Sequence, residues 1–239
     1  MRYLKQVVKQ IPGVRSAYHF AVTQYELFNL RRRTAEYVFT DIYRGNKWEG
    51  TSSLSGIGSD LAQTRVVRNE LPAVCREFAI HTMLDIPCGD FHWMKHVDLE
   101  SIDYTGADIV ADMVRADRQY EASNVHFCKL NLIGDKLPKV DLVFCRDCLV
   151  HLCFRDTFIA LRNICNSGST YLLTTTFTSR SHNRDIVTGQ WRTLNLEVTP
   201  FRFPRPLKTI NEKYTQEDGA YSDKCLGLWR VKDIGECLI

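Results

Sequence analysis

The sequence predicts an α/β fold in which helices cover both faces of a parallel β-sheet. Between residues 82 and 176, short apolar segments alternate with segments of helical periodicity, which is typical of parallel sheets. Two of the apolar segments end in an acidic residue, Asp85 and Asp108, and a turn containing Gly89 follows the first. A strand–turn–helix–strand unit with these features is suited to hold a nucleoside at the strand ends.

The remaining elements follow from the same periodicities. A Gly/Ser-rich loop is expected at residues 44–60, and Ser59 or Asp60 suits the N-cap of a helix that runs to about Glu77. A long polar and aromatic loop is expected at residues 178–206, followed by an antiparallel hairpin of strands 207–214 and 225–232. The other expected strands are 82–86, 103–108, 125–129, 140–145 and 170–176, and the other expected helices are 91–97, 111–121 and 156–166.

The N-terminal residues 1–40 are expected to form a helical extension, with the main domain at residues 41–239. After Pro12-Gly13, apolar residues recur at helical spacing at Val14, Tyr18, Val22, Tyr25 and Phe28. Residues 1–33 hold seven Lys or Arg and one acidic residue. This segment could contact a membrane surface or a partner protein, but the favoured interpretation is a helix that caps the main domain.

Composition excludes several classes of protein. The net charge of +3 is concentrated in the N-terminal segment, so the main domain lacks the basic excess of a nucleic-acid groove, and no nucleic-acid partner is expected. No apolar run approaches the roughly 20 residues of a membrane span. The nine cysteines mostly lie in apolar runs, which favours buried, reduced thiols and a cytoplasmic location.

The glycine pattern indicates which nucleoside the predicted unit binds. Dinucleotide-binding turns use three glycines, whereas only Gly89 is present here and Pro87 stands at the first position. A ligand without phosphates does not need the extra backbone clearance, so the pattern favours S-adenosylmethionine over NAD. Asp108, at the end of the second strand, suits the ribose hydroxyls, and Asn131, after the third, suits the adenine edge.

On these residues the chain resembles class I S-adenosylmethionine-dependent methyltransferases. The segment 85–91 matches the acid and the central glycine of the first family motif, with Pro87 and Phe91 at the outer glycine positions. Asp108 matches the ribose-binding acid, Asn131 with Leu132 stands at the adenine-contacting motif, and residues 141–147 match the fourth motif. The resemblance covers roughly residues 40–239 and implies a Rossmann-like doubly wound sheet of strand order 3-2-1-4-5-7-6 with an antiparallel terminal hairpin strand.

A narrower resemblance, to a little-characterised branch of these methyltransferases, rests on the segments 48–64, 145–152 and 183–192. Some relatives in that branch accompany glycan-modifying enzymes, which favours a sugar hydroxyl as the acceptor. In the loop 55–59, the serine hydroxyls and the unhindered N–H groups of the glycines suit the carboxylate of the cofactor. The expected cofactor-binding residues are Trp48, Ser55, Gly56, Ser59, Asp85, Pro87, Gly89, Asp90, Asp108, Ile109, Asn131, Leu132 and Arg146.

Asp147 and His151 follow the fourth strand, where the resemblance places the methyl acceptor. In a helical turn they share one face, and a histidine oriented by an aspartate suits removal of a hydroxyl proton. The alternative is that His151 is a satisfied core histidine while Asp147 contacts the amino group of the cofactor. In the long loop, mixed polar and aromatic residues suit a sugar, and the expected substrate contacts are Asn183, Arg184, Asp185, Trp191 and Arg192; a structural cover over the sheet edge is the alternative.

Cys145-x-x-Cys148 with His151 invites a zinc or redox interpretation. Zinc requires a further ligand, and the chain has no second C-x-x-C motif, so no metal is expected. The sequence therefore predicts an S-adenosyl-L-methionine-dependent methyltransferase that methylates a hydroxyl of a small molecule or glycan. The alternatives are a protein or nucleic-acid methyltransferase and a non-catalytic cofactor-binding protein that acts through a partner.

Overall fold

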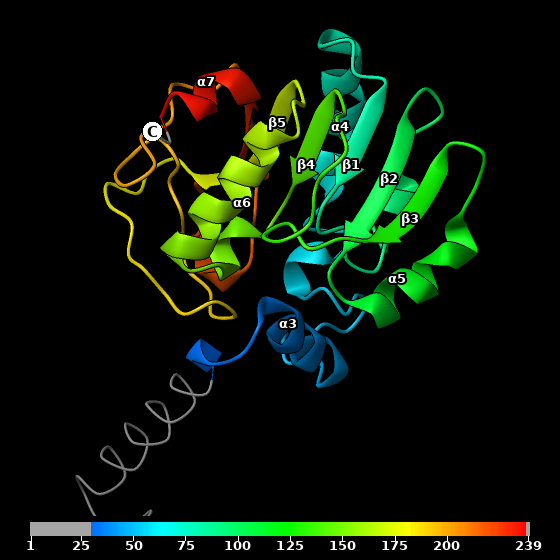
Figure 1. The fold of residues 1–239 in the computed structure, drawn as a ribbon, viewed down its shortest axis with the longest axis horizontal. Coiled ribbons are helices and arrows are strands. Elements are labelled where there is room, and N and C mark those ends of the chain that lie inside the picture. Colours follow the sequence, from blue (N-terminus) through cyan, green and yellow to red (C-terminus); the bar gives the residue numbers. More distant parts are fainter. Residues whose placement is uncertain (1–29, 238–239) are drawn as a thin grey trace, which may run out of the picture.

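The computed structural model describes residues 30–237, so the apolar stripe expected at residues 14–28 lies outside the described residues. Within them, one sheet contains seven strands in the order β3-β2-β1-β4-β5-β7-β6, which confirms the predicted strand order (Figure 1). The strands are β1 (Thr82–Asp85), β2 (Asp103–Asp108), β3 (Val125–Lys129), β4 (Leu142–Cys145), β5 (Tyr171–Phe177), β6 (Lys208–Asn211) and β7 (Lys224–Arg230).

One strand of the terminal hairpin, β7, runs opposite to all the others, as the sequence predicts. The strands β3, β2, β1, β4 and β5 run parallel, whereas β7 pairs antiparallel with both β5 and β6. In the register of β5 and β7, Phe177 lies opposite Lys224. The beginning of β7 therefore lies at the edge where the parallel strands end, which brings Lys224 to the carboxyl edge of the sheet.

Helices cover the two faces of the sheet because successive strand residues point to opposite sides. In β4, Leu142 and Phe144 join one apolar cluster with α4, and Val143 and Cys145 join the other with α6. These four side chains are fully buried. The helices of the main domain are α4 (Arg65–Glu77), α5 (Ala111–Asp117), α6 (Phe154–Asn166) and α7 (Val231–Gly235).

The helix α3 (Ala35–Arg44) lies across the carboxyl edge of the strands (Figure 1). The Thr34 hydroxyl caps it by accepting a hydrogen bond from the Tyr37 amide at 3.2 Å, and its apolar face buries Val38 and Ile42. Helix α3 thus packs on the main domain, whereas the helix expected before it, over the apolar stripe, lies outside the described residues. Helix α3 continues through residue 40, where a domain boundary is predicted.

Two predicted helix positions were wrong. The helix expected at residues 91–97 is only the 3₁₀ turn η2 (Met94–His96). Gly89 and Phe91 both have positive φ, 64° and 52°, so the chain turns twice before any helix can begin. The second error concerns an earlier helix. Helix α4 begins after Thr64 rather than after Ser59 or Asp60, because residues 57–59 form the separate 3₁₀ turn η1 (Ile57–Ser59).

The long segment between β5 and β6 is folded onto the sheet rather than extended into solvent. Its apolar residues Leu194, Leu196, Phe201 and Phe203 join the core cluster that contains α6. The first three of these side chains are 0% exposed. Most of this segment is therefore a structural cover, as the alternative interpretation of the sequence proposes.

All nine cysteines lie among the described residues and are free thiols. In residues 30–237 no group of three or more His, Cys, Asp or Glu side chains is placed to hold a metal ion. Of the helices in this range, none combines the length and the apolar composition needed to cross a membrane.

Candidate functional site

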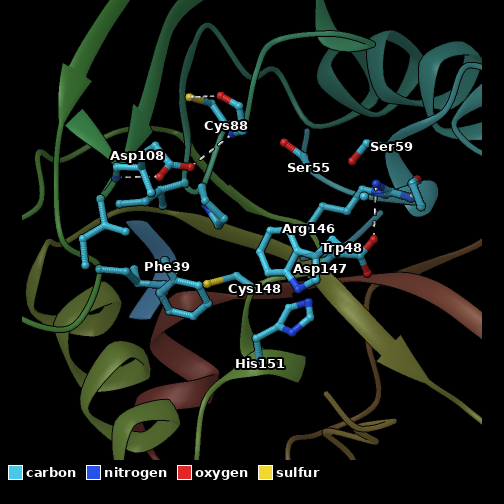
Figure 2. A pocket seen from close by; sticks show the side chains of 18 of the residues that line it. Phe39, Trp48, Ser55, Ser59, Cys88, Asp108, Arg146, Asp147, Cys148 and His151 are labelled. Carbon is cyan, nitrogen blue, oxygen red and sulfur yellow. Dashed lines mark hydrogen bonds and ion pairs between the residues drawn. The ribbon is translucent and has the colours of Figure 1, made fainter. Parts of the chain in front are cut away.

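A cavity of about 390 Å³ opens at the carboxyl edge of the parallel strands. This is where parallel α/β sheets bind ligands, because the loops that follow the strands converge there. Helix α3 and the Gly/Ser-rich loop close its other side. Figure 2 shows Asp108 toward one end of the cavity and Asp147 and His151 toward the other, with Trp48 between the loop and His151.

The turn after β1 is built around Gly89. A Cβ atom on Gly89 would lie 2.4 Å from the hydroxyl oxygen of Ser55, and φ at Gly89 is 64°. Only glycine suits both conditions. The absence of a side chain thus lets the Ser55 loop lie directly on the turn, and both segments line the cavity.

Asp90 has a different role from the expected cofactor contact. It is absent from the cavity lining. Its carboxylate instead accepts hydrogen bonds from the Ser53 hydroxyl at 2.9 Å and the Leu54 amide at 2.8 Å. Asp90 therefore anchors the Gly/Ser-rich loop against the β1 turn, a tertiary role that local sequence spacing does not reveal.

Asp108 lies at the end of β2, and its carboxylate faces the cavity (Figure 2). Oδ1 accepts a hydrogen bond from the Val110 amide at 2.9 Å, and Oδ2 accepts one from the Gly89 amide at 3.3 Å. Burial raises the pKa of Asp108 to about 6, although these amides favour the charged form. Each carboxylate oxygen can accept more than one bond, so Asp108 retains acceptor capacity toward a ligand.

Asp85, at the end of β1, also lines the cavity but is only 2% exposed. Its Oδ2 accepts a hydrogen bond from the Tyr104 hydroxyl at 2.7 Å. Burial raises the pKa of Asp85 to about 8, and the nearby Asp108 charge adds to the rise. Near neutral pH Asp85 is therefore mainly protonated, and Asp108 is the ionised carboxylate of this pair.

Several other expected cofactor-binding residues line the same cavity. They are Trp48, Ser55, Gly56, Ser59, Pro87, Ile109, Asn131, Leu132 and Arg146. The Asn131 side-chain oxygen already accepts a hydrogen bond from the Ile133 amide at 2.9 Å. Asn131 thus shapes the turn after β3 as well as facing the cavity.

His151 lies in the 3₁₀ turn η4 (Leu149–His151) that follows β4, and it lines the cavity. Its Nδ1 atom is 3.0 Å from the carbonyl oxygen of Gln190. Because a carbonyl oxygen only accepts, Nδ1 carries the proton and Nε2 of the neutral ring carries a lone pair. Burial lowers the pKa of His151 below 6.5, so the neutral ring is favoured. Trp48 packs on this ring at a centroid distance of 5.0 Å.

The expected orientation of His151 by Asp147 was wrong. The carboxylate of Asp147 accepts instead from Lys224 Nζ, 2.6 Å from Oδ2, and Arg146 Nη1 lies 3.3 Å from the same oxygen. Burial alone would raise the pKa of Asp147, but the charges of Lys224 and Arg146 hold it well below its usual range. Both Asp147 and His151 line the cavity, as predicted, but through separate partners.

Arg146 connects the charged end of the cavity to the Gly/Ser-rich loop. Its Nη2 atom donates to the Gly58 carbonyl at 2.9 Å and to Glu212 at 2.7 Å. The Nζ atom of Lys224 lies 3.5 Å from the same oxygen of Glu212. Two cations and two carboxylates thus form a cluster beside the cavity, which we call the charge cluster: Arg146, Asp147, Glu212 and Lys224. All but Asp147 are buried.

Most of the residues expected to contact the substrate lie outside the cavity lining. Of the five, only Trp191 lines the cavity. Asn183 bonds the backbone of Asn195 and Thr199, and Asp185 accepts from the Phe154 amide at the start of α6. Arg184 is exposed outside the cavity lining. Arg192 is 1% exposed and is also absent from the lining. Asn183, Asp185 and Arg192 therefore hold the segment to the rest of the fold.

The sequence analysis missed a group of aromatic and charged residues that line the cavity. Tyr214 and Tyr221 flank the η5 turn (Glu217–Gly219) between β6 and β7, and Lys224 begins β7. Tyr221 packs against Trp191 at a centroid distance of 4.9 Å. Nothing in the local sequence marks these residues, because the antiparallel insertion of β7 beside β5 brings them to the site. The lining also includes Phe39, Tyr43, Trp93 and Cys148.

Solved structures share this architecture. Human N-acetylserotonin methyltransferase, in complex with SAM, aligns with a TM-score of 0.57 and 17% identity over 83% of this chain and 60% of its own. N-methyltransferase NodS from Bradyrhizobium japonicum WM9 aligns with a TM-score of 0.53 and 13% identity over 72% of this chain and 97% of its own. An S-adenosylmethionine-dependent methyltransferase from Clostridium acetobutylicum gives 0.51 and 10% identity over 71% and 91%.

The strand order and these likenesses show that the chain has the fold of class I S-adenosylmethionine-dependent methyltransferases, as the sequence motifs indicate. The chain spans 60% of the length of the human enzyme. No protein-family model and no curated protein matches the sequence.

Proposed function

We propose that the protein is an S-adenosylmethionine-dependent methyltransferase that methylates a hydroxyl group of a small molecule or glycan. The observation that carries this proposal is the hydrogen bond between His151 Nδ1 and the Gln190 carbonyl, 3.0 Å long. It leaves Nε2 of a neutral imidazole as a proton acceptor in the cavity that also contains Asp108 and Gly89.

The residues at the other end of the cavity fit the cofactor. The Asp108 carboxylate retains acceptor capacity for the two ribose hydroxyls. Asn131 faces the adenine end, and the hydroxyls of Ser55 and Ser59 suit the carboxylate of the methionine portion. When bound, the cofactor supplies an electrophilic methyl group on a sulfonium sulfur.

His151 provides the base that hydroxyl methylation requires. A hydroxyl is a weak nucleophile until its proton is removed, and a histidine whose pKa lies near or below the working pH accepts that proton. Burial keeps the ring neutral, and the contact with Trp48 limits its rotation.

Trp191, Tyr214 and Tyr221 suit the non-reacting part of the acceptor. Trp191 is 39% exposed and lines the cavity, so part of its indole is accessible to a ligand. Aromatic rings pack on the apolar faces of sugars and of other ring compounds, while tyrosine hydroxyls bond to polar groups. These residues support an acceptor with a ring and several hydroxyl groups.

The direct test is turnover. The protein is incubated with methyl-labelled S-adenosylmethionine and with separate panels of sugars, hydroxylated small molecules, amines, proteins and nucleic acids, and S-adenosylhomocysteine is quantified. We expect product with a hydroxylated acceptor and loss of turnover in His151→Asn with cofactor affinity retained. Turnover only with amines, proteins or nucleic acids contradicts the hydroxyl assignment.

Cofactor binding without turnover on any panel would instead favour the non-catalytic alternative. A failure of both S-adenosylmethionine and S-adenosylhomocysteine to raise the melting temperature contradicts the cofactor assignment as well, since a ligand that binds the folded state stabilises it.

A further inference from the structure

The segment around Gln190 is joined to the turn that contains His151 by backbone hydrogen bonds. The Gly189 amide donates to the His151 carbonyl at 2.9 Å, and the Arg192 amide donates to the Val150 carbonyl at 3.1 Å. The bond from His151 Nδ1 to the Gln190 carbonyl adds to these contacts. The segment thus holds both the backbone and the ring of His151. The segment therefore determines where His151 points.

The Arg192 side chain lies beneath this junction. It is 1% exposed, and its Nη1 atom donates to the carbonyls of Leu152 at 2.6 Å and Val150 at 3.4 Å. Its guanidinium lies 5.1 Å from the ring centroid of Phe154. The two bonded carbonyls belong to the residues on either side of His151, so the guanidinium holds the turn at both of its flanks.

Arg192 has an unusual environment for a buried cation. Its Nε and Nη2 atoms have no hydrogen-bond partner among the described residues, and its charge is hydrogen-bonded to carbonyls rather than to a carboxylate. Burial lowers the pKa of Arg192 to about 10. Placing a cation in such an environment is unfavourable, and an apolar side chain would fill the space without this penalty. A role in the adjacent site accounts for the charge.

We infer that Arg192 is a positioning residue that holds His151 in the orientation of a base and whose charge adds to the effect of burial in favouring the neutral imidazole. The inference rests on the proposed function, because the base role of His151 belongs to it. Arg192 itself does not line the cavity, so it acts through the turn and through its field rather than by contact with a substrate.

The charges that reach His151 come from three elements. Burial is the largest cause of its lowered pKa; the Gln190 carbonyl and the Asp147 charge oppose it, whereas Lys224 and Arg192 add to it. Asp147 and Lys224 form an ion pair 2.6 Å long, so their effects on His151 largely cancel. Arg192 is the last of these causes in order of size, and the Asp185 carboxylate is the anion whose charge reaches it. Removal of Arg192 therefore raises the pKa of His151 without removing the effect of burial.

The experiment compares Arg192→Met with Arg192→Lys in the full chain. The methionine variant removes charge and hydrogen bonds, and the lysine variant keeps the charge but lacks the planar donor group. Arg155→Met is the matched control, because the Arg155 side chain on α6 is 84% exposed. Titration of His151 by nitrogen-15 NMR, with its signals assigned by their loss in His151→Asn, reports the tautomer and the pKa without requiring activity.

We expect the His151 pKa to rise in Arg192→Met toward its ordinary value, together with a loss of the Nδ1–H preference. In Arg192→Lys the pKa stays low. If the acceptor is known, the acid limb of the pH–rate profile moves to higher pH in Arg192→Met, and kcat falls by roughly 10- to 100-fold with unchanged cofactor affinity, as a misplaced catalytic group predicts. Arg155→Met matches the parent in all of these measurements.

A folded Arg192→Met with the parental tautomer and pKa overturns the inference. If that variant does not fold, an Arg192→Lys variant with a shifted His151 pKa overturns the electrostatic part, and one with unchanged kcat and tautomer overturns the positioning part. If the NMR titration shows the expected changes but the protein turns over no acceptor, Arg192 is confirmed as a determinant of the tautomer and pKa of His151. The failure then lies in the proposed function.

Discussion

The Nζ atom of Lys224 lies 2.6 Å from Oδ2 of Asp147, although 77 positions separate the two residues in the sequence. The pair joins the start of β7 to the loop after β4, at the edge where the cavity opens. Glu212, whose side chain is 0% exposed, binds Arg146 behind this pair and completes the charge cluster. The cluster thus couples both terminal strands to the candidate site.

Loss of charge at Glu212 is expected to destabilise the protein strongly. Glu212→Gln keeps the shape of the side chain but leaves Arg146 and Lys224 with one carboxylate between them. Removing one member of a buried ionic group typically lowers the free energy of unfolding by roughly 3–5 kcal/mol. Urea denaturation measures the difference. Glu77→Gln is the control, because Glu77 pairs with Lys208 at the surface, and a loss below about 1 kcal/mol is expected there.

Asp85 is expected to make the stability of the cofactor-free protein fall as pH rises. Its folded-state pKa is raised to about 8 from 3.8. Between these values the folded state retains a proton that the unfolded chain releases, so the stability contributed by that proton is present at low pH and lost by about pH 8. Between pH 4 and pH 8, the interval that these two pKa values define, the melting temperature of Asp85→Asn should therefore fall less than that of the parent.

The exposed residue Glu100 offers a matched control for this comparison. Glu100→Gln removes an acidic group without removing a buried one, and its pH dependence should match that of the parent. Equal pH dependence of Asp85→Asn and Glu100→Gln would contradict the raised pKa of Asp85.

Asp108 is expected to dominate the pH dependence of cofactor affinity. Its pKa is raised to about 6, and only the ionised carboxylate accepts hydrogen bonds from both ribose hydroxyls. Titration calorimetry with S-adenosylhomocysteine should therefore show weaker binding as pH falls through about 6. Asp108→Ala should weaken binding by more than about tenfold, because bonds to a charged group contribute roughly 1.5–3 kcal/mol each. Unchanged affinity at pH 7.5 would show that Asp108 does not bind the ribose.

The sheet and the cofactor end of the cavity were predictable because their signals are local. An apolar strand followed by Asp85 and Gly89, and a second strand ending in Asp108, specify a turn and two carboxylates within about one βαβ unit. The strands lie within two residues of their predicted ends up to β5. Such patterns depend on periodicity and on backbone conformation, which neighbouring residues determine.

The acceptor end was harder to predict because its polar residues find partners far along the chain. Asp185 bonds the Phe154 amide across 31 positions, and Asp90 binds the Ser53 loop across 37. A polar side chain in a loop has the same sequence appearance whether it faces a ligand or caps a distant helix. Only the packing of β7 beside β5 places Lys224 and Tyr221 next to Trp191 and His151.

His151 is expected to control the acid limb of the rate profile. Since its pKa is lowered below 6.5, kcat should be constant near neutral pH and fall as the ring is protonated at lower pH. His151→Asn should reduce kcat by roughly 100-fold or more, as the loss of a general base predicts, and should keep parental affinity for S-adenosylhomocysteine. Initial rates across pH 5–8 at saturating acceptor measure both effects. Full activity in His151→Asn would leave it as a core histidine.

Trp191 is expected to bind the acceptor without taking part in the reaction. It is 39% exposed, lines the cavity and packs against Tyr221, so part of the indole remains accessible from the cavity. Trp191→Ala should raise KM for the acceptor by roughly tenfold, since an aromatic contact contributes about 0.5–1.5 kcal/mol in addition to the area that it buries. Trp191→Phe keeps a ring and should retain much of the affinity.

The cofactor end supplies the internal control for this prediction. The exchanged ring lies at the acceptor end, so both Trp191 variants should bind S-adenosylhomocysteine with parental affinity, and their kcat at saturating acceptor should change little because His151 is held by the Gln190 backbone carbonyl. Steady-state rates with varied acceptor separate KM from kcat. An unchanged KM in Trp191→Ala would show that Trp191 does not contact the acceptor. A weakened affinity for S-adenosylhomocysteine would show that the ring supports the whole cavity instead.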